Sequence, residues 1–164
     1  MINTKKIRIF IDMDGVLADF DKELKKNKKI IEELNLVHLD AADEVNFSSI
    51  KPIPNAITSY LYLFNRFDVY IASTAPWAAP KAWRDKREWV EHYLGKYGLK
   101  RLILTHHKNL LQGDYLIDDR TANGAGEFEG KLIQFGTKTY PDWKSVIDYF
   151  VNKYPEEKPS FSMN

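Results

Sequence analysis

The chain of 164 residues contains no cysteine, which excludes disulfide bonds, thiolate metal sites and cysteine nucleophiles. Its formal net charge is only +1, so charge gives no reason to expect a nucleic-acid polymer or an anionic membrane as a partner. It also lacks the apolar core of a signal peptide and any segment that could span a bilayer. We therefore expect a protein of the cytoplasm.

What the sequence does contain is the composition of an ordinary globular protein, with 44% hydrophobic and 29% charged residues. The length favours one domain with a well-buried core. Apolar runs predict strands at 7–11, 68–73, 101–105, 115–117 and 131–135, and helical patterns cover 22–36, 55–66, 81–97 and 141–154. This alternation predicts a parallel sheet with right-handed crossovers.

One interval, residues 21–51, is too long for a single crossover. We expect a small helical cap there, inserted between two core segments, 1–20 and 52–154. Residues 155–164 are rich in Pro, Glu, Lys and Ser and predict a flexible tail. Within the cap, the predicted helix has four apolar residues to serve as contacts: Leu24, Ile30, Ile31 and Leu34.

Two carboxylates, Asp12 and Asp14, follow directly on a first strand that should be buried on both faces. Ligands of open α/β sheets bind just beyond the carboxyl ends of such strands, where a divalent cation and a phosphate could meet. Asp-x-Asp-Gly is also ordinary turn chemistry. The stretch alone leaves both interpretations open.

Four polar clusters lie at or just after the ends of predicted strands: Asp12 and Asp14, Ser73 and Thr74, Lys108, and Asp118 and Asp119. The carboxyl ends of parallel strands share one edge of a sheet, so these clusters can converge. Clustered carboxylates repel one another unless a cation lies among them, and oxygen ligands suit Mg²⁺. A hydroxyl and a lysine would then bind a phosphoryl group. The sequence predicts a site for phosphoryl transfer.

Each cluster has a simpler explanation when taken alone. The acid pair before Arg120 could form a loop with a salt bridge, and Ser73 or Thr74 could cap the segment that follows. Lys108 could be one of many solvated lysines. Their joint occurrence at strand ends, in this order, favours the functional interpretation.

The stretch Asp12-Met13-Asp14-Gly15-Val16-Leu17 resembles the first motif of the haloacid dehalogenase superfamily of aspartyl phosphotransferases. Ser73, Lys108 and the pair Asp118-Asp119 match its second, third and fourth motifs in the required order. Within this superfamily, the sequence is most similar to the 5'(3')-deoxyribonucleotidases, the cytosolic type C 5'-nucleotidases. The segments that carry this similarity are 15–20, 52–54, 86–95 and 115–120.

This resemblance implies an α/β, Rossmann-like three-layer sandwich, with a central five-stranded parallel sheet in the order 3-2-1-4-5 and a small helical cap after the first strand. It implies that Asp12 is the nucleophile and Asp14 the general acid and base. Mg²⁺ would be held by the side chain of Asp12, the backbone carbonyl of Asp14 and the pair Asp118 and Asp119. Ser73, Thr74 and Lys108 would bind the phosphoryl group.

Substrate selection is where the sequence departs from the family pattern. Phe20 matches an aromatic residue that packs against the nucleobase, although it could instead pack between cap and core. The cap is short, with Phe47 as its main aromatic residue. The Thr-Ser-Pro that follows the second strand in the family is one residue longer here, Ser73-Thr74-Ala75-Pro76. Trp77 and Trp83 could supply a stacking face or belong to the core, and the core is favoured for Trp83.

The function predicted from these residues is Mg²⁺-dependent hydrolysis of nucleoside monophosphates, of deoxyribonucleotides in particular, through an aspartyl-phosphate. The short cap leaves a phosphosugar or another small phosphate ester open as the substrate. A non-catalytic phosphate-binding module is disfavoured, because all four motif positions hold chemically competent residues.

Overall fold

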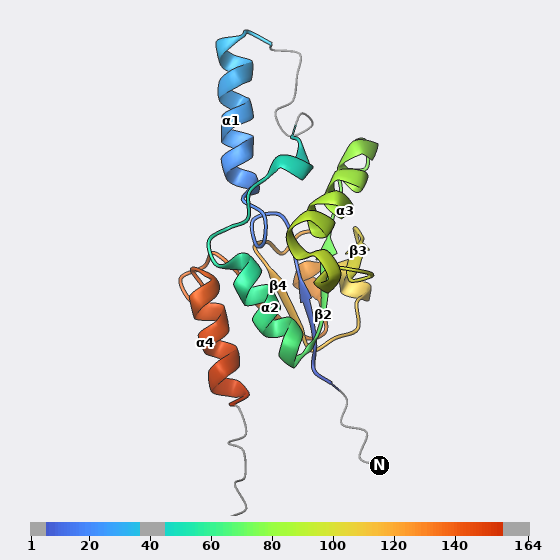
Figure 1. The fold of residues 1–164 in the computed structure, drawn as a ribbon, viewed down its shortest axis with the longest axis vertical. Helices are drawn as coiled ribbons and strands as arrows, with labels where there is room; N and C mark the ends of the chain where they lie inside the picture. Colours follow the sequence, from blue (N-terminus) through green and yellow to red (C-terminus); the bar gives the residue numbers. More distant parts are fainter. Residues whose placement is uncertain (1–5, 37–44, 156–164) are drawn as a thin grey trace, which may run out of the picture.

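The computed structural model describes residues 6–36 and 45–155, which form an α/β protein around one parallel sheet (Figure 1). Its five strands are β1 (Arg8–Ile11), β2 (Asp68–Ser73), β3 (Leu102–Leu104), β4 (Tyr115–Asp118) and β5 (Lys131–Gln134). Its helices are α1 (Phe20–Glu33), α2 (Ala56–Arg66), α3 (Pro80–Leu94) and α4 (Trp143–Lys153). Short 3-10 segments are η1 (Phe47–Ser49), η2 (Gly95–Tyr97), η3 (Lys108–Leu110) and η4 (Ala125–Glu127).

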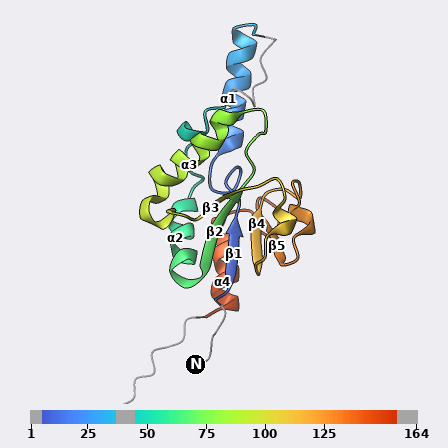
Figure 2. The same cartoon turned by 90° about the vertical axis from the view of Figure 1, so that its right-hand side faces the viewer.

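The strands lie in the order β3-β2-β1-β4-β5, and every pairing is parallel (Figure 2). The first strand is central: Ile9 pairs with Val69 of β2 on one side and with Tyr115 of β4 on the other. Ile9, Phe10 and Ile11 are almost fully buried, as expected for a strand covered on both faces. The predicted sheet and its strand order are confirmed.

The two faces of the sheet are covered differently. On one face, a large apolar cluster joins the sheet to α2, α3 and α4 through residues such as Leu63, Trp89 and Phe150. On the other face, a small cluster around Phe10 and Leu116 is closed by η4 and its neighbours, including Phe128. The third layer of the predicted sandwich is therefore built from short 3-10 segments.

Helix α1 stands away from the sheet, beyond the carboxyl end of β1 (Figure 1). Leu24 packs against the core, but no residue of α1 is fully buried among the described parts of the chain. Ile30 and Leu34 are 40% and 63% exposed there, so the predicted apolar contacts are wrong for these two residues. The reason is geometric, because only the first turns of the helix lie near the sheet. Part of the predicted cap, residues 37–44, and most of the predicted tail lie outside the described residues.

The predicted boundary of the last helix shifts for a local reason. Helix α4 begins at Trp143 and not at Pro141, because Asp142 is its N-cap. The Asp142 carboxylate accepts a hydrogen bond from the backbone N–H of Ser145 at 2.9 Å, and the Ser145 hydroxyl donates back to the Asp142 carbonyl. None of the helices described within residues 6–36 and 45–155 has the length and apolar character needed to cross a membrane.

Two buried tryptophans tie helices to the segments on either side of α1. Trp143 of α4 donates from Nε1 to the carbonyl of Val16 at 2.8 Å, and Trp89 of α3 donates to the carbonyl of Ile50 at 2.8 Å. Both indole rings are completely buried. The loop after β1 is thus fixed from the helical layer.

We expect Trp143→Phe to destabilise the protein, because it leaves the Val16 carbonyl buried without its donor. Such a group costs about 1–3 kcal/mol in the free energy of unfolding, besides the cost of the smaller ring. Urea denaturation measures the change. Val151→Ala, at an exposed position of the same helix, should change stability by less than about 0.5 kcal/mol. An equal loss in both variants would contradict the assigned role of the Trp143 hydrogen bond.

Candidate active site

The loop after β1 is rigid because nearly every apolar side chain in it is buried. Met13, Val16 and Leu17 are completely buried, and the Met13 carbonyl accepts hydrogen bonds from the backbone N–H groups of Leu17 and Ala18 at 2.8 Å each. The backbone N–H of Asp12 donates to the Ile117 carbonyl at 2.8 Å, which continues the sheet pairing one residue past the strand. The loop therefore fixes the directions of Asp12 and Asp14, which are 4% and 8% exposed.

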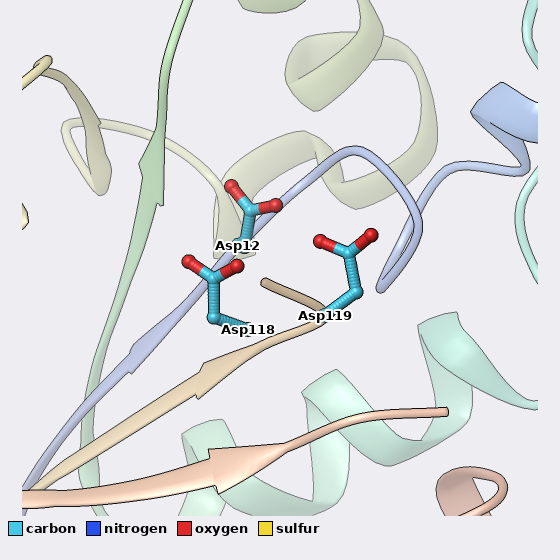
Figure 3. A group of neighbouring side chains, drawn as sticks. All are labelled: Asp12, Asp118 and Asp119. Carbon is cyan, nitrogen blue, oxygen red and sulfur yellow. The ribbon is translucent and has the colours of Figure 1, made fainter. Parts of the chain in front are cut away.

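Three carboxylates meet at this edge of the sheet (Figure 3). Asp12 follows β1, Asp118 ends β4 and Asp119 comes next in the chain; each offers one oxygen, and these oxygens lie within 4.8 Å of one another. Their carboxyl groups are directed to the same side of the strands (Figure 3). The Asp14 side chain is not a member of this group, which is compatible with the predicted contribution of its backbone carbonyl alone.

Gly15 is required by the same geometry. Its φ of +75° lies in the left-handed region, and a Cβ at this position would come within 2.6 Å of Asp119 Oδ2. The first acidic loop and the second are therefore packed directly on each other.

Lys108, in η3, bridges two of the acids. Its Nζ lies 2.8 Å from Asp12 Oδ1 and 2.5 Å from Asp118 Oδ2, and the residue is 3% exposed. Asp118 also accepts a hydrogen bond from the backbone N–H of Arg120 at 3.0 Å. The Arg120 side chain is placed 3.6 Å from Asp119 Oδ1. The lysine predicted to bind phosphate thus lies in the site, where its charge is paired with Asp12 and Asp118.

A second buried lysine, Lys86 of α3, was not singled out from the sequence. Its Nζ contacts Asp14 Oδ2 at 2.5 Å and Ser73 Oγ at 3.0 Å, and it lies 4.5 Å from the centre of the Phe47 ring. It is completely buried. The available signal was its place on the apolar face of α3, since Ala82, Lys86 and Trp89 are spaced so as to share one side of a helix.

The predicted hydroxyls separate into two positions. Ser73 is completely buried against Lys86, whereas Thr74 lines the small cavity at the sheet edge. The Thr74 hydroxyl donates to the Thr105 carbonyl at 2.8 Å, which joins the loops after β2 and β3. The cavity measures about 20 Å³, and its lining consists of Asp12, Asp14, Thr74, Lys108, Asp118, Arg120, Ala122 and Asn123.

Burial and repulsion from Asp12 raise the pKa values of Asp14, Asp118 and Asp119. Burial raises the pKa of Asp14 above its ordinary value and Asp12 adds to the effect, while Lys86 opposes it. Burial and the neighbouring Asp12 raise the pKa of Asp118 to about 6, against the opposing charge of Lys108. Burial also raises the pKa of Asp119. In turn, burial disfavours the charged form of Lys108, but Asp12 and Asp118 outweigh it and raise the pKa of this lysine.

The donor set fits a hard divalent cation. Asp12, Asp118 and Asp119 supply oxygen ligands only. Two buried carboxylate oxygens, Asp14 Oδ1 and Asp119 Oδ1, have no hydrogen-bond partner among the described residues. A cation that binds among the acids would give these oxygens a partner and would lower the raised carboxyl pKa values.

Phe20, the predicted nucleobase contact, packs on Phe47. The two rings are stacked, with centroids 5.7 Å apart and an interplanar angle of 20°. Phe47 is 3% exposed and Phe20 is half-buried. The contact agrees with the alternative in which Phe20 joins cap and core, and the nucleobase contact stays a prediction.

Comparisons with known proteins agree with this geometry. Residues 32–146 match the family described as "5' nucleotidase, deoxy (Pyrimidine), cytosolic type C protein". A "Putative 5'(3')-deoxyribonucleotidase" of Vibrio phage KVP40 is 49% identical over 152 residues, covering 92% of this chain and 88% of the relative. A protein of the same name from Bordetella pertussis is 34% identical, covering 68% of this chain and 73% of the relative.

The fold has a solved counterpart. The crystal structure of the "putative HAD-hydrolase YfnB" from Bacillus subtilis, bound to magnesium, superposes with a TM-score of 0.59 at 11% identity. The match covers 88% of this chain and 98% of that one. The family match over most of the chain and the phage relative confirm the resemblance found in the motifs, and this chain belongs to the phosphatase family of cytosolic type C 5'-nucleotidases, the 5'(3')-deoxyribonucleotidases.

Proposed function

We propose that this protein is a Mg²⁺-dependent phosphomonoesterase that hydrolyses nucleoside monophosphates, and deoxyribonucleotides in particular. The observation that carries the proposal is the meeting of Asp12, Asp118 and Asp119 at the carboxyl edge of the sheet, with Lys108 between two of them and Asp14 beside them. The family and its named relatives supply the nucleotide as the class of substrate.

The metal would be held by the carboxylates of Asp12, Asp118 and Asp119, with the backbone carbonyl of Asp14 as a further oxygen. When bound, Mg²⁺ would neutralise negative charge on the phosphoryl oxygens during transfer. Thr74 and Lys108 line the cavity and would bind the phosphoryl group. Ser73 is completely buried, and its hydroxyl accepts a hydrogen bond from Lys86. It would therefore support the site from behind the cavity wall.

Asp12 is the nucleophile in this proposal. Its carboxylate attacks phosphorus, and the bond between phosphorus and the ester oxygen of the leaving alcohol breaks, which leaves an aspartyl-phosphate. Lys108 holds Asp12 through Oδ1, so the carboxylate is oriented before substrate arrives. Water then attacks the aspartyl-phosphate, releases inorganic phosphate and restores the Asp12 carboxylate.

Asp14 is the general acid of the first step and the general base of the second. Protonated, it donates to the leaving alcohol; ionised, it then accepts a proton from the attacking water. Burial raises the pKa of Asp14 and favours the protonated form needed first, while the charge of Lys86 limits this rise and favours the ionised form needed second. Lys86 also fixes the position of Asp14 through the contact at Oδ2.

Two predictions made from composition are carried forward. We propose a cytoplasmic location, and neither a nucleic-acid polymer nor a membrane as a partner. The net charge of only +1 supports the second of these proposals, the absence of a polyanionic partner.

We expect Asp12→Asn to lower kcat for nucleoside monophosphates by at least about 10³-fold, because an amide cannot form the acyl-phosphate. Phosphate release measures the loss, and circular dichroism and Tm check the fold. Asp21→Asn, at an exposed position in α1, is the matched control and should keep full activity. Near-normal hydrolysis by Asp12→Asn would exclude the covalent mechanism.

We expect Lys86→Met to lower kcat by about tenfold or more and to move the acid-side limb of the pH–rate profile to higher pH. Methionine keeps the length but removes the charge that lowers the pKa of Asp14, so Asp14 ionises only at higher pH. The pH dependence of kcat measures the shift. Lys81→Met, on the exposed side of the same helix, should leave the profile unchanged. A profile that keeps its position in Lys86→Met would remove Lys86 from this role.

We expect Mg²⁺ to raise Tm and EDTA to stop phosphate release, because the cation relieves repulsion among the three carboxylates. In Asp119→Asn the rise in Tm should disappear over the same range of concentrations. Asp148→Asn, which removes an exposed acid of α4 paired with Lys144, should keep it. A wild-type protein that is active in EDTA and insensitive to Mg²⁺ would refute the metal site.

A further inference from the structure

A tryptophan lies exposed on the loop between β2 and α3. Trp77 is 82% exposed in the described structure, although an indole ring carries one of the largest apolar surfaces of any side chain. An exposed indole near a site offers a flat apolar surface on which an aromatic ligand can stack.

The ring of Trp77 is held in place by two neighbours. The centre of the Trp83 ring lies 6.3 Å from that of Trp77 at an interplanar angle of 78°, and the centre of the His106 ring lies 6.1 Å from it at 67°. Trp83 and His106 also contact each other at 6.0 Å. Trp83 is anchored by a hydrogen bond from its Nε1 to the Pro76 carbonyl at 3.1 Å, within the loop that carries Trp77. The exposed ring therefore has a fixed base, and most of its surface remains open to solvent.

The same two loops line the catalytic cavity. Thr74, three residues before Trp77, and Lys108, two residues after His106, both belong to the cavity wall. The hydrogen bond from the Thr74 hydroxyl to the Thr105 carbonyl joins the loops at the cavity. Consecutive Cα atoms are about 3.8 Å apart, so the Cα of Trp77 lies at most about 11 Å from that of Thr74. In a nucleoside monophosphate, one sugar separates the base from the phosphate. The distance from phosphate to base is therefore similar to the distance from Thr74 to Trp77.

Phe20, the other aromatic candidate, is less available. One face of its ring is stacked on Phe47, and the residue is half-buried. Trp77 has no stacked ring partner among the described residues, and it is 82% exposed.

We propose that Trp77 is the platform on which the nucleobase of the substrate stacks, and that Trp83 and His106 position it. The inference rests on the proposed hydrolysis of nucleoside monophosphates and names the residue that selects them over smaller phosphate esters. Stacking uses the π-face that every base has, so this contact recognises a base without distinguishing strongly between bases.

The test compares thymidine 5'-monophosphate with 2-deoxyribose 5-phosphate, which has a hydroxyl group in place of the base. We expect Trp77→Ala to raise KM for the nucleotide by about fivefold or more, the scale of one base stacked on an aromatic ring. Its KM for the sugar phosphate and its kcat for both should change less than about twofold. Trp77→Phe should retain most of the nucleotide affinity. Leu99→Ala, which truncates another exposed apolar side chain (68% exposed), should change neither KM.

Two other results would overturn the proposal, and they are distinguishable. If wild type hydrolyses the nucleotide and Trp77→Ala leaves its KM unchanged, or raises the KM of both substrates equally, the stacking role is wrong and the proposed function stands. If wild type hydrolyses the sugar phosphate and no nucleotide, the proposed substrate class and the stacking role fall together. The unfolding temperature of Trp77→Ala should match that of wild type, because the residue is exposed.

Discussion

The structure depends on holding four carboxylates at one edge of the sheet against their mutual repulsion. Asp12, Asp14 and Asp118 are almost fully buried, and unpaired charges in such a place are strongly destabilising. Two buried lysines compensate: Lys108 bridges Asp12 and Asp118, and Lys86 bridges Asp14 and Ser73. Each lysine reaches two partners, and three of these four contacts are to carboxylates. The apolar layers on both faces of the sheet then serve to hold these lysines within hydrogen-bond distance.

Much of the fold and the centre of the site could be predicted from the sequence, because both follow from local patterns. Each strand is a short apolar run, and a polar cluster marks the end of β1, β2 and β4. Parallel pairing then brings separate clusters to one edge of the sheet. Their proximity could therefore be predicted without predicting the structure of any loop. Asp12, Thr74, Lys108 and Asp118 accordingly line one cavity.

The remaining features depend on tertiary contacts that leave little trace in a single sequence. A lysine in a charged helix looks solvated, and only the way α3 packs buries Lys86 against Asp14. The apolar spacing of α1 predicted contacts for Ile30 and Leu34, but the helix extends past the sheet that would have covered them. The stacking of Phe20 on Phe47 is likewise a tertiary contact that the sequence pattern does not predict.

The central place of β1 also determines when the site can exist during synthesis of the chain. Ile9 pairs with Tyr115, so a strand made near the beginning waits for a neighbour made more than a hundred residues later. Asp118 and Asp119 come at and just after the end of β4, so the group of carboxylates that they form with Asp12 cannot assemble until β4 has left the ribosome. Long-range pairing of this kind slows folding. The group of three carboxylates is therefore complete only when β4 pairs with β1.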